Sequence, residues 1–143
     1  MKPTNATKPA NNRCVGVYIF NDDGSKVLLT QRGPGARNYR FKWEGPGGAL
    51  EPGESYEQAA HREILEELGI HIELGEVLGE FFITVDDSGD VWDTKIFSAT
   101  TKEIPSIQEP TKCVGIGWFG PHDAVKLDLA DYAIKDMQLL GWM

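Results

Sequence analysis

Three glutamates, Glu63, Glu66 and Glu67, lie close together in the 143-residue sequence, at spacings that place their side chains on one side of a helix. At about 100° per residue, the three carboxylates fall within an arc of roughly 100°. The neighbouring arc is apolar and consists of Ala60, Ile64, Leu65 and Leu68. Carboxylates that converge without an equal number of cations are what a hard divalent cation such as Mg²⁺ requires. The three glutamates are therefore candidate metal ligands, and an acidic, solvated helix face is the simpler alternative.

The same glutamates work against the stability of the helix that carries them. Glu63 and Glu67 form a like-charge pair four residues apart, which costs about a few tenths of a kcal/mol. Glu66 and Glu67 also lie in the last turn, where the helix dipole disfavours anions by roughly 0.3–1 kcal/mol each. A bound cation would offset both penalties, and this favours a metal site over a solvated face.

Local sequence signals predict where this helix begins and ends. Ser55 is a suitable N-cap, Gln58 completes a capping box, and Gly69 supplies the C-terminal stop, so we expect a helix over residues 56–68. Arg62 is positioned to pair with a carboxylate. The glycines of the preceding segment 45–48 permit close approach of the backbone to a ligand.

The segment 33–53 is rich in glycine and proline and also contains basic and aromatic side chains. This composition indicates a loop shaped around a ligand, with a flexible linker as the alternative. The candidate substrate-binding residues in it are Arg37, Arg40, Phe41, Trp43, Gly47 and Gly48.

Strand signals flank the predicted helix on both sides. β-Branched and aromatic runs predict one hairpin from residues 14–20 and 27–29, a second from 80–85 and 91–100 across a turn at 86–90, and a further strand at 114–119. A helix start is indicated near His122, and residues 127–140 read as a closing amphipathic helix. This order predicts an α/β fold with a mixed β-sheet between helices.

The composition sets limits on the function. The net charge of −8 and the pI of about 4.8 argue against binding of a nucleic acid polymer, which requires clustered Lys and Arg. Residues 1–12 are polar without an apolar run, so we expect a flexible tail before a single domain at 13–143, no membrane anchor and a cytoplasmic location. The two cysteines, Cys14 and Cys113, lack metal-ligand spacing and are expected to be reduced thiols.

Taken as one unit, the segment from Gly48 to Ile70 resembles the Nudix box at every specified position. The matching residues are Gly48, Glu54, Arg62, Glu63, Ile64, Glu66, Glu67, Gly69 and Ile70. The preceding Trp43-Glu44-Gly45-Pro46-Gly47 also resembles the usual lead-in to this motif. The resemblance implies a Nudix-type α/β/α sandwich and hydrolysis of a nucleoside diphosphate that is linked to another moiety.

The resemblance also implies roles for individual residues. Glu63, Glu66 and Glu67 would hold Mg²⁺, or Mn²⁺ in its place, and Arg62 would orient these carboxylates partly by pairing with Glu54. Gly48 would let the loop run against the helix. The general base would be Glu66, Glu67 or a glutamate from a later loop, for which Glu103 and Glu109 are the candidates.

Substrate preference is indicated by the segment 109–119, which resembles a stretch found in Nudix enzymes that act on nucleoside triphosphates, including oxidised ones. The proline typical of the ADP-ribose subgroup is missing, since none lies between Pro52 and Pro105, and no tyrosine typical of the dinucleoside-polyphosphate subgroup lies between Tyr56 and Tyr132. The expected partner is thus a small nucleotide, bound by a monomer or homodimer. A nucleotide sugar or ADP-ribose as substrate, and a non-catalytic nucleotide sensor, remain open alternatives.

Overall fold

A computed structural model gives the structure of residues 2–3, 12–85 and 90–143. Within these residues, eight strands form one mixed sheet. The strands are β1 (Lys2–Pro3), β2 (Asn12–Phe20), β3 (Val27–Arg32), β4 (Trp43–Glu44), β5 (Gly47–Ala49), β6 (Glu73–Val85), β7 (Asp90–Thr100) and β8 (Cys113–Phe119). The helices are α1 (Tyr56–Leu68), α2 (Pro121–Ala124) and α3 (Asp131–Leu139).

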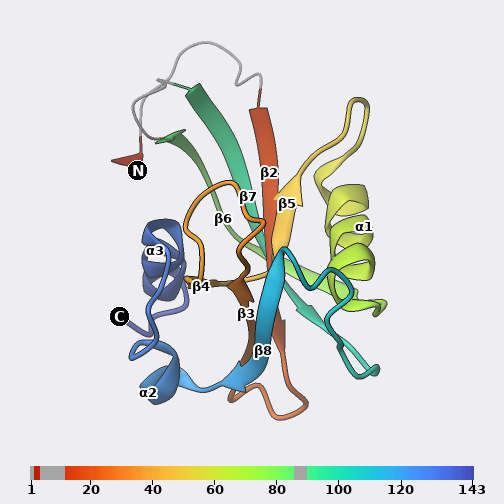
Figure 1. The fold of residues 1–143 in the computed structure, drawn as a ribbon, viewed down its shortest axis with the longest axis vertical. Coiled ribbons are helices and arrows are strands. Elements are labelled where there is room, and N and C mark those ends of the chain that lie inside the picture. The colour runs from red at the N-terminus through yellow and green to blue at the C-terminus, as the bar shows by residue number, and fades with distance from the viewer. Residues whose placement is uncertain (1, 4–11, 86–89) are drawn as a thin grey trace.

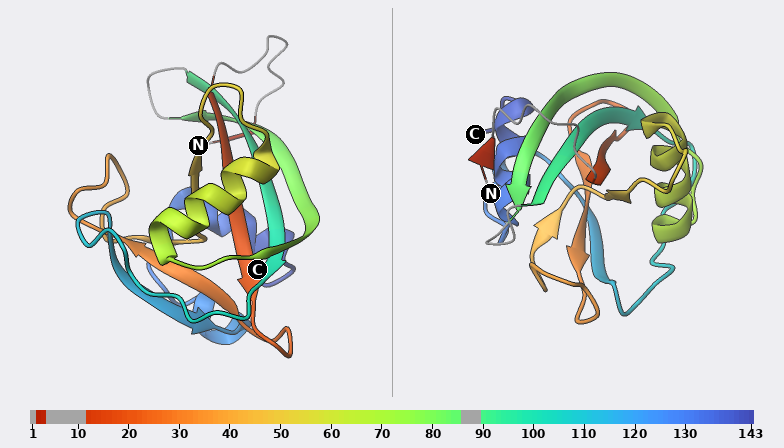
Figure 2. Two further views of the ribbon diagram at one scale, coloured as in Figure 1. Left: turned by 90° about the vertical axis from the view of Figure 1, so that its right-hand side faces the viewer. Right: turned by 90° about the horizontal axis from the view of Figure 1, so that it is seen from above.

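The sheet lies between α1 on one side and α3 on the other (Figure 1). Its order is β1-β6-β7-β2-β3-β4, with β5 paired to β2 and β8 paired to β3. β2 and β7 run parallel over the whole length of β2, whereas β6 and β7 form a long antiparallel hairpin. The view from above shows β6 and β7 curving from the α3 side toward α1 (Figure 2). The predicted fold class, a mixed sheet between helices, is confirmed.

The strand β2 separates two hydrophobic clusters because its side chains alternate between the two faces of the sheet. Val17 and Ile19 pack with the apolar side of α1, including Ile64. Tyr18 packs on the other face with residues of α3, including Met137. The cores under the two helices are therefore built on the same strand.

The first predicted hairpin forms only next to its turn. The turn at residues 21–26 is present, with the Asn21 amide nitrogen 3.0 Å from the Lys26 carbonyl oxygen, but Phe20 and Val27 are the one pair of residues in register between β2 and β3. The two strands then diverge, because β2 pairs with β5 and β7 while β3 pairs with β8. Long-range pairing replaces the local ladder that the sequence suggested.

The closing helix is shorter than predicted. Leu127 closes a turn after α2, and residues 128–130 then pair with β4, because the Trp43 amide donates to the Asp128 carbonyl at 2.9 Å and the Ala130 amide donates to the Trp43 carbonyl at 3.0 Å. This pairing satisfies backbone groups that a helix would otherwise use. The helix start predicted near His122 is present as α2.

Other expectations differ from the structure or fall outside it. The segment 33–53, expected as a loop, contains the short strands β4 and β5. The turn at 86–89 and residues 4–11 of the expected tail lie outside the described residues, whereas Lys2–Pro3 pairs with β6. None of the described helices combines the length and apolar character needed to span a membrane.

Candidate functional site

The helix α1 has the boundaries that its capping residues predicted. The Ser55 hydroxyl accepts a hydrogen bond from the Gln58 amide at 3.0 Å, and the Gln58 side chain accepts one from the Ser55 amide at 2.9 Å. Gly69 ends the helix in the left-handed conformation at φ 67°. These caps fix the register of the acidic face relative to the loop that precedes the helix.

The three box glutamates differ in their surroundings. The Glu66 side chain is 52% exposed, whereas that of Glu63 is 15% exposed and Glu67 is half-buried. Burial raises the pKa of Glu63, although hydrogen bonding to Arg62 opposes the shift. Burial also raises the pKa of Glu67 well above its ordinary value, and the charges of Glu44 and Glu63 add to the effect. The inner carboxylates are thus held where a free negative charge is unfavourable.

Arg62 joins the helix to the loop before it. Its Nε and Nη2 atoms donate to the two carboxylate oxygens of Glu54 at 2.7 and 2.8 Å. Its Nη1 atom donates to Glu63 at 2.9 Å and to Glu66 at 3.2 Å, and Nη2 also donates to the carbonyl of Ala49 at 3.0 Å. One guanidinium therefore aligns two candidate metal ligands and the strand β5.

Two glycines allow the loop to approach the helix closely. A Cβ atom on Gly48 would lie 2.5 Å from the carboxylate carbon of Glu63. A Cβ atom on Gly47, which has φ 155°, would lie 2.0 Å from the carbonyl oxygen of Val15. A larger side chain at either position would displace β5 from α1 or from β2, so both glycines shape the site.

A cavity of about 340 Å³ opens beside Glu67, and it is named the acidic cavity for its three glutamates, which three basic residues balance. Its charged lining residues are Arg32, Arg37, Glu44, Glu67, Glu109 and Lys112. Glu109 comes from the segment before β8, and its carboxylate lies 3.6 Å from the Lys112 amine. The structure therefore places Glu109 in the same cavity as Glu67, where a base from a later loop is expected.

The other candidate base, Glu103, lies elsewhere. Its carboxylate accepts a hydrogen bond from the His71 amide at 2.8 Å and lies 3.2 Å from the His71 ring nitrogen Nδ1. It lines neither the acidic cavity nor the apolar cavity described below. This placement leaves Glu109 as the later glutamate that can reach the site.

The donor set fits a divalent cation. In the described part of the chain, no three Asp, Glu, His or Cys side chains already converge at metal-binding distances. Arg62 pairs with Glu54, Glu63 and Glu66 and leaves Glu67, among the described residues, without a cationic partner. Mg²⁺ or Mn²⁺ would supply that charge, with waters and phosphate oxygens completing the coordination shell.

Glu44 lies at the boundary between the acidic cavity and a second cavity. Its carboxylate accepts hydrogen bonds from Arg32 Nη1 at 3.0 Å and from the hydroxyl of Tyr132. Arg32 also donates to the carbonyl and side-chain oxygens of Asn38, at 2.8 and 3.1 Å. These bonds connect β3, β4 and α3, and they fix Glu44 in spite of its burial.

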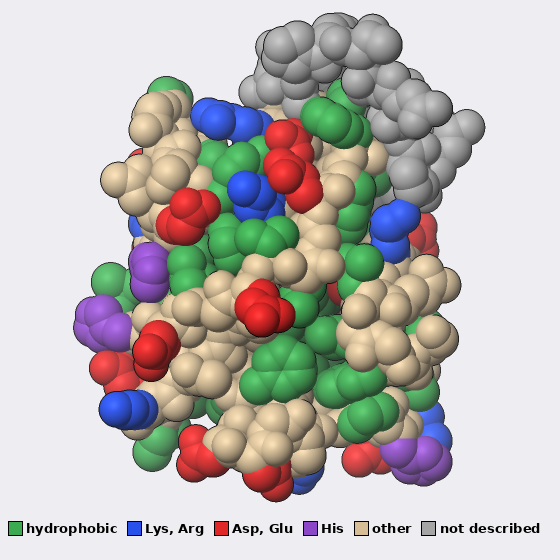
Figure 3. All heavy atoms as spheres, turned by 180° about the vertical axis from the view of Figure 1, so that it is seen from behind, with side chains coloured by type: hydrophobic (Ala, Val, Ile, Leu, Met, Phe, Trp, Pro, Cys, Tyr) green, Lys and Arg blue, Asp and Glu red, His purple; other side chains and the backbone are tan. Residues whose placement is uncertain are grey.

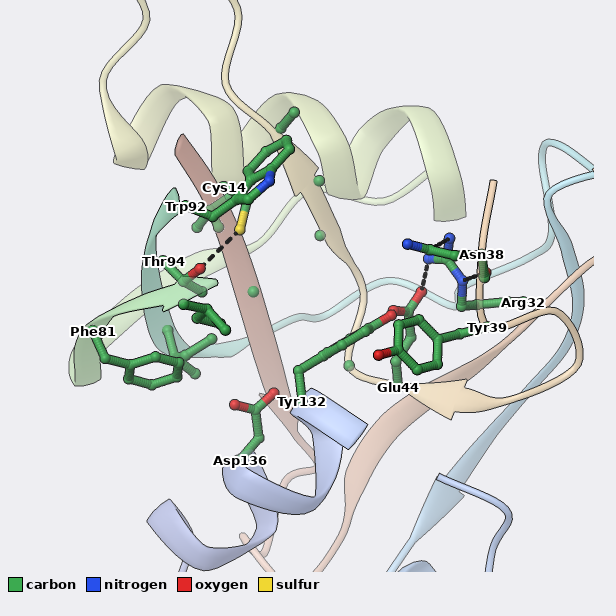
Figure 4. A pocket seen from close by; sticks show the side chains of 18 of the residues that line it. Cys14, Arg32, Asn38, Tyr39, Glu44, Phe81, Trp92, Thr94, Tyr132 and Asp136 are labelled. Atoms are coloured by element: carbon green, nitrogen blue, oxygen red, sulfur yellow. Dashed lines mark hydrogen bonds and ion pairs between the residues drawn. The ribbon is translucent and has the colours of Figure 1, made fainter. Parts of the chain in front are cut away.

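The second cavity, the apolar cavity, has a volume of about 480 Å³ and lies between the sheet and α3 (Figure 4). Its apolar wall comes from β6 and β7 and consists of Phe81, Ile83, Trp92 and Ile96. The two cavities share Arg32, Arg37, Glu44 and Gly47. An elongated ligand can therefore place an apolar or aromatic end in one cavity and a charged end in the other.

The apolar cavity also has polar lining residues, among them Asp136 on α3 and, apart from it, Cys14 and Thr94 (Figure 4). The Tyr18 hydroxyl donates to Asp136 Oδ2 at 2.6 Å, and Cys14 Sγ lies 3.1 Å from the Thr94 hydroxyl. Burial raises the pKa of Asp136 to about 7 and that of the Cys14 thiol to about 11. Cys113 is also a free thiol and lines the acidic cavity, so the two cysteines belong to different cavities.

The predicted substrate-binding residues separate into two groups. Arg37, Gly47 and Gly48 line the apolar cavity, and Arg37 and Gly47 line both cavities. Arg40 and Phe41 are exposed outside both linings, and Arg40 Nε donates to the Ala36 carbonyl at 2.9 Å. Trp43 packs edge-on against Phe119 at 5.2 Å between ring centroids. The structure thus assigns Trp43 to the core rather than to either cavity.

The sequence interpretation missed Arg32, Glu44, Tyr132 and Asp136. Glu44 is within the Trp43-to-Gly47 segment that was singled out only for its likeness to a motif. Asp136 carried a usable signal, because it adjoins Met137 on the buried side of α3, where a charged residue is unusual. Arg32 ends a strand and had no comparable signal.

Comparison with known proteins gives a consistent set of similarities. A family model described as NUDIX domain matches residues 10–140. The chain is 32% identical over 99 residues to the 8-oxo-dGDP phosphatase of Homo sapiens, covering 68% of this chain and 28% of that protein. It is 38% identical over 80 residues to an RNA pyrophosphohydrolase of Roseobacter denitrificans, covering 56% and 48%.

Among solved structures, a MutT NUDIX hydrolase from Burkholderia pseudomallei is similar over 90% of this chain and 96% of its own, with a TM-score of 0.79 and 26% identity. The two curated relatives are matched over less than half of their lengths, 28% and 48%. The similarity therefore extends through most of the described fold but covers only part of those relatives.

Proposed function

Because the chain belongs to the NUDIX domain family, we propose that it is a divalent-metal-dependent hydrolase of a nucleoside triphosphate, which it cleaves to a nucleoside monophosphate and pyrophosphate. The observation that carries this proposal is the junction of the acidic and apolar cavities at Arg32, Arg37, Glu44 and Gly47. The apolar cavity accommodates a nucleoside. The acidic cavity accommodates a polyphosphate with its metal, beside Glu67.

The reaction needs a group that activates water and groups that hold the phosphates in line. When bound, Mg²⁺ lowers the pKa of water and neutralises phosphate charge. Glu63, Glu66 and Glu67 would hold the cation, and Arg62 keeps the carboxylates of Glu63 and Glu66 aligned. Glu109, across the acidic cavity, accepts the proton of the attacking water, while Arg37 contacts the phosphates.

The balance of charge supports a small substrate with few phosphates. The charged linings of the two cavities contain three basic residues, Arg32, Arg37 and Lys112, and Arg32 and Lys112 are paired with glutamates. A polyphosphate must therefore bring cations with it. This agrees with a metal-complexed triphosphate.

A second candidate substrate follows from the relative that acts on RNA. A 5′-triphosphate end of RNA presents the same linkage, but a bound polynucleotide adds phosphates that require Lys and Arg. The net charge of this chain is −8, and on the face seen from behind, Lys and Arg side chains are scattered among acidic and apolar ones (Figure 3). These features favour a free nucleotide.

The remaining alternatives are an ADP-ribose or nucleotide-sugar hydrolase and a non-catalytic sensor. The intact set of Glu63, Glu66 and Glu67, with Arg62 holding two of them, favours catalysis over sensing. The names of the relatives in this family describe different substrates. The 8-oxo-dGDP phosphatase and the RNA pyrophosphohydrolase show this diversity.

The test is a hydrolysis panel with millimolar Mg²⁺. It compares nucleoside triphosphates, oxidised purine triphosphates, ADP-ribose, nucleotide sugars and dinucleoside polyphosphates, and it identifies the products by chromatography. We expect a triphosphate to give the highest kcat/KM and to release pyrophosphate. A preference of more than about tenfold for ADP-ribose or a nucleotide sugar overturns the triphosphate assignment, and no hydrolysis of any compound overturns the enzyme assignment.

A further inference from the structure

The lining of the apolar cavity includes a buried carboxyl group that the proposed hydrolysis does not use. Asp136 is 5% exposed and projects from α3 toward the space between Phe81 and Tyr132 (Figure 4). It does not line the acidic cavity that contains Glu67. A charged residue on the buried side of a helix has a structural cost, so its presence here calls for a partner.

The partners of Asp136 within the protein satisfy only part of its carboxylate. Oδ2 accepts the Tyr18 hydroxyl at 2.6 Å, and no salt bridge joins Asp136 to a Lys or Arg in residues 2–3, 12–85 and 90–143. The neighbouring Lys135 has its amine over the Phe81 ring, 4.9 Å from the centroid. An ionised carboxylate offers about four acceptor positions, so positions remain for a ligand.

The polar residues Glu44 and Arg37 line both cavities, whereas Asp136 lines only the apolar cavity. Glu44 is occupied by Arg32 and Tyr132, so it has less capacity for a ligand than Asp136. Arg37 also lines the acidic cavity, in which the proposed function places the phosphates. A nucleotide oriented by its phosphates therefore directs its base toward Asp136.

We propose that Asp136 is a specificity-determining residue that accepts hydrogen bonds from the adjacent N–H donors of a guanine-type base edge, an inference that rests on the proposed nucleotide function. Guanine presents a ring N–H and an amino group side by side, which match the two oxygens of a carboxylate. Adenine and cytosine place a ring acceptor beside their amino group, and that acceptor would face the carboxylate. Hydrogen bonds to a charged acceptor are among the stronger ones, and they gain strength away from water.

The test measures binding of monophosphates without metal, so that it does not depend on hydrolysis. Calorimetry at about pH 8 compares GMP, IMP and AMP, because the carboxylate form of Asp136 predominates there. IMP differs from GMP only by the missing amino group. We expect GMP to bind about tenfold more tightly than IMP and more tightly still than AMP, since a site built for a donor rejects the analogue that lacks it.

The variant Asp136→Asn keeps the size of the side chain and replaces one acceptor oxygen with a donor. We expect it to reduce the GMP-to-IMP preference to within about threefold. The matched control is Asp123→Asn, the same change at an exposed position of α2, which should leave the preference unchanged. Tyr18→Phe removes the hydroxyl that positions Asp136, and it should weaken GMP binding more than AMP binding.

The outcomes separate this inference from the proposed function. Equal binding of GMP and IMP by the wild type, no measurable binding of any monophosphate, or an unchanged preference in Asp136→Asn each overturns the role of Asp136. Failure of the hydrolysis panel with Mg²⁺ would overturn the proposed enzyme while leaving a guanine-selective binding site in place. Melting curves establish that each variant is folded before binding is compared.

Discussion

The guanidinium of Arg62 holds the carboxylate of Glu54 with two parallel hydrogen bonds, from Nε at 2.7 Å and from Nη2 at 2.8 Å. This pair joins the loop before α1 to the acidic face of the helix. The hydrogen bonds from Arg62 lower the pKa of Glu54 to about 2, so the pair is charged throughout the neutral range. Because Arg62 also bonds to Glu63 and Glu66, the position of the candidate metal ligands depends on this contact.

Arg62→Lys should lower kcat by at least about tenfold while the protein stays folded. A lysine lacks the planar guanidinium that donates to both carboxylate oxygens of Glu54 at once. The measurement is steady-state hydrolysis with saturating Mg²⁺. Lys102→Arg, an exposed position outside both cavities, is the control and should retain full activity. Equal rates for Arg62→Lys and the wild type would show that this guanidinium does not position the ligands.

Glu67→Gln should reduce kcat by at least about 100-fold, since it removes a charged metal ligand without changing the size of the side chain. The same change should raise the melting temperature of the metal-free protein near neutral pH. Burial, with the charges of Glu44 and Glu63, raises the pKa of Glu67, so its ionised form destabilises the fold. Normal turnover would remove Glu67 from the site, and a lower melting temperature without metal would contradict the electrostatic argument.

Mg²⁺ and nucleotide should strengthen each other's binding. A ligand that binds only the folded state raises the melting temperature, and Mg²⁺ shared between Glu67 and substrate phosphates gains affinity when both are present. Thermal denaturation with Mg²⁺, with a non-hydrolysable nucleotide, and with both provides the measurement. We expect the shift with both to exceed the sum of the two separate shifts. Shifts that are merely additive would exclude shared coordination.

The elements with local signals could be predicted from the sequence. The bounds of α1 follow from Ser55, Gln58 and Gly69, whose capping interactions involve only neighbouring residues. The acidic face of α1 follows from the helical period, which places Glu63, Glu66 and Glu67 on one side. The pairing of β2 with β7 could not be predicted, because nothing near Phe20 shows that its strand leaves the local hairpin for a partner about 80 residues away.

The site was predictable to the same extent. Glu63, Glu66, Glu67 and Arg62 lie in one contiguous motif on α1, and Arg62 bonds to Glu63 and Glu66. Tyr132 and Asp136 reach the apolar cavity only because α3 packs across the sheet, so their position depends on the tertiary fold. The short α3 has the same cause, since backbone pairing with Trp43 competes with the helix.

Asp136 should make stability depend on pH. Burial raises its pKa from an ordinary 3.8 to about 7, although Tyr18 opposes the shift by hydrogen bonding, the charge of Glu44 adds to it and that of Lys135 reduces it. The folded state therefore holds a proton that the unfolded state releases between these values, and the stability contributed by this group falls as pH rises through that window. Asp136→Asn should raise the melting temperature more at about pH 8 than at about pH 5, measured beside Asp123→Asn. An equal effect at both pH values would show that Asp136 titrates normally.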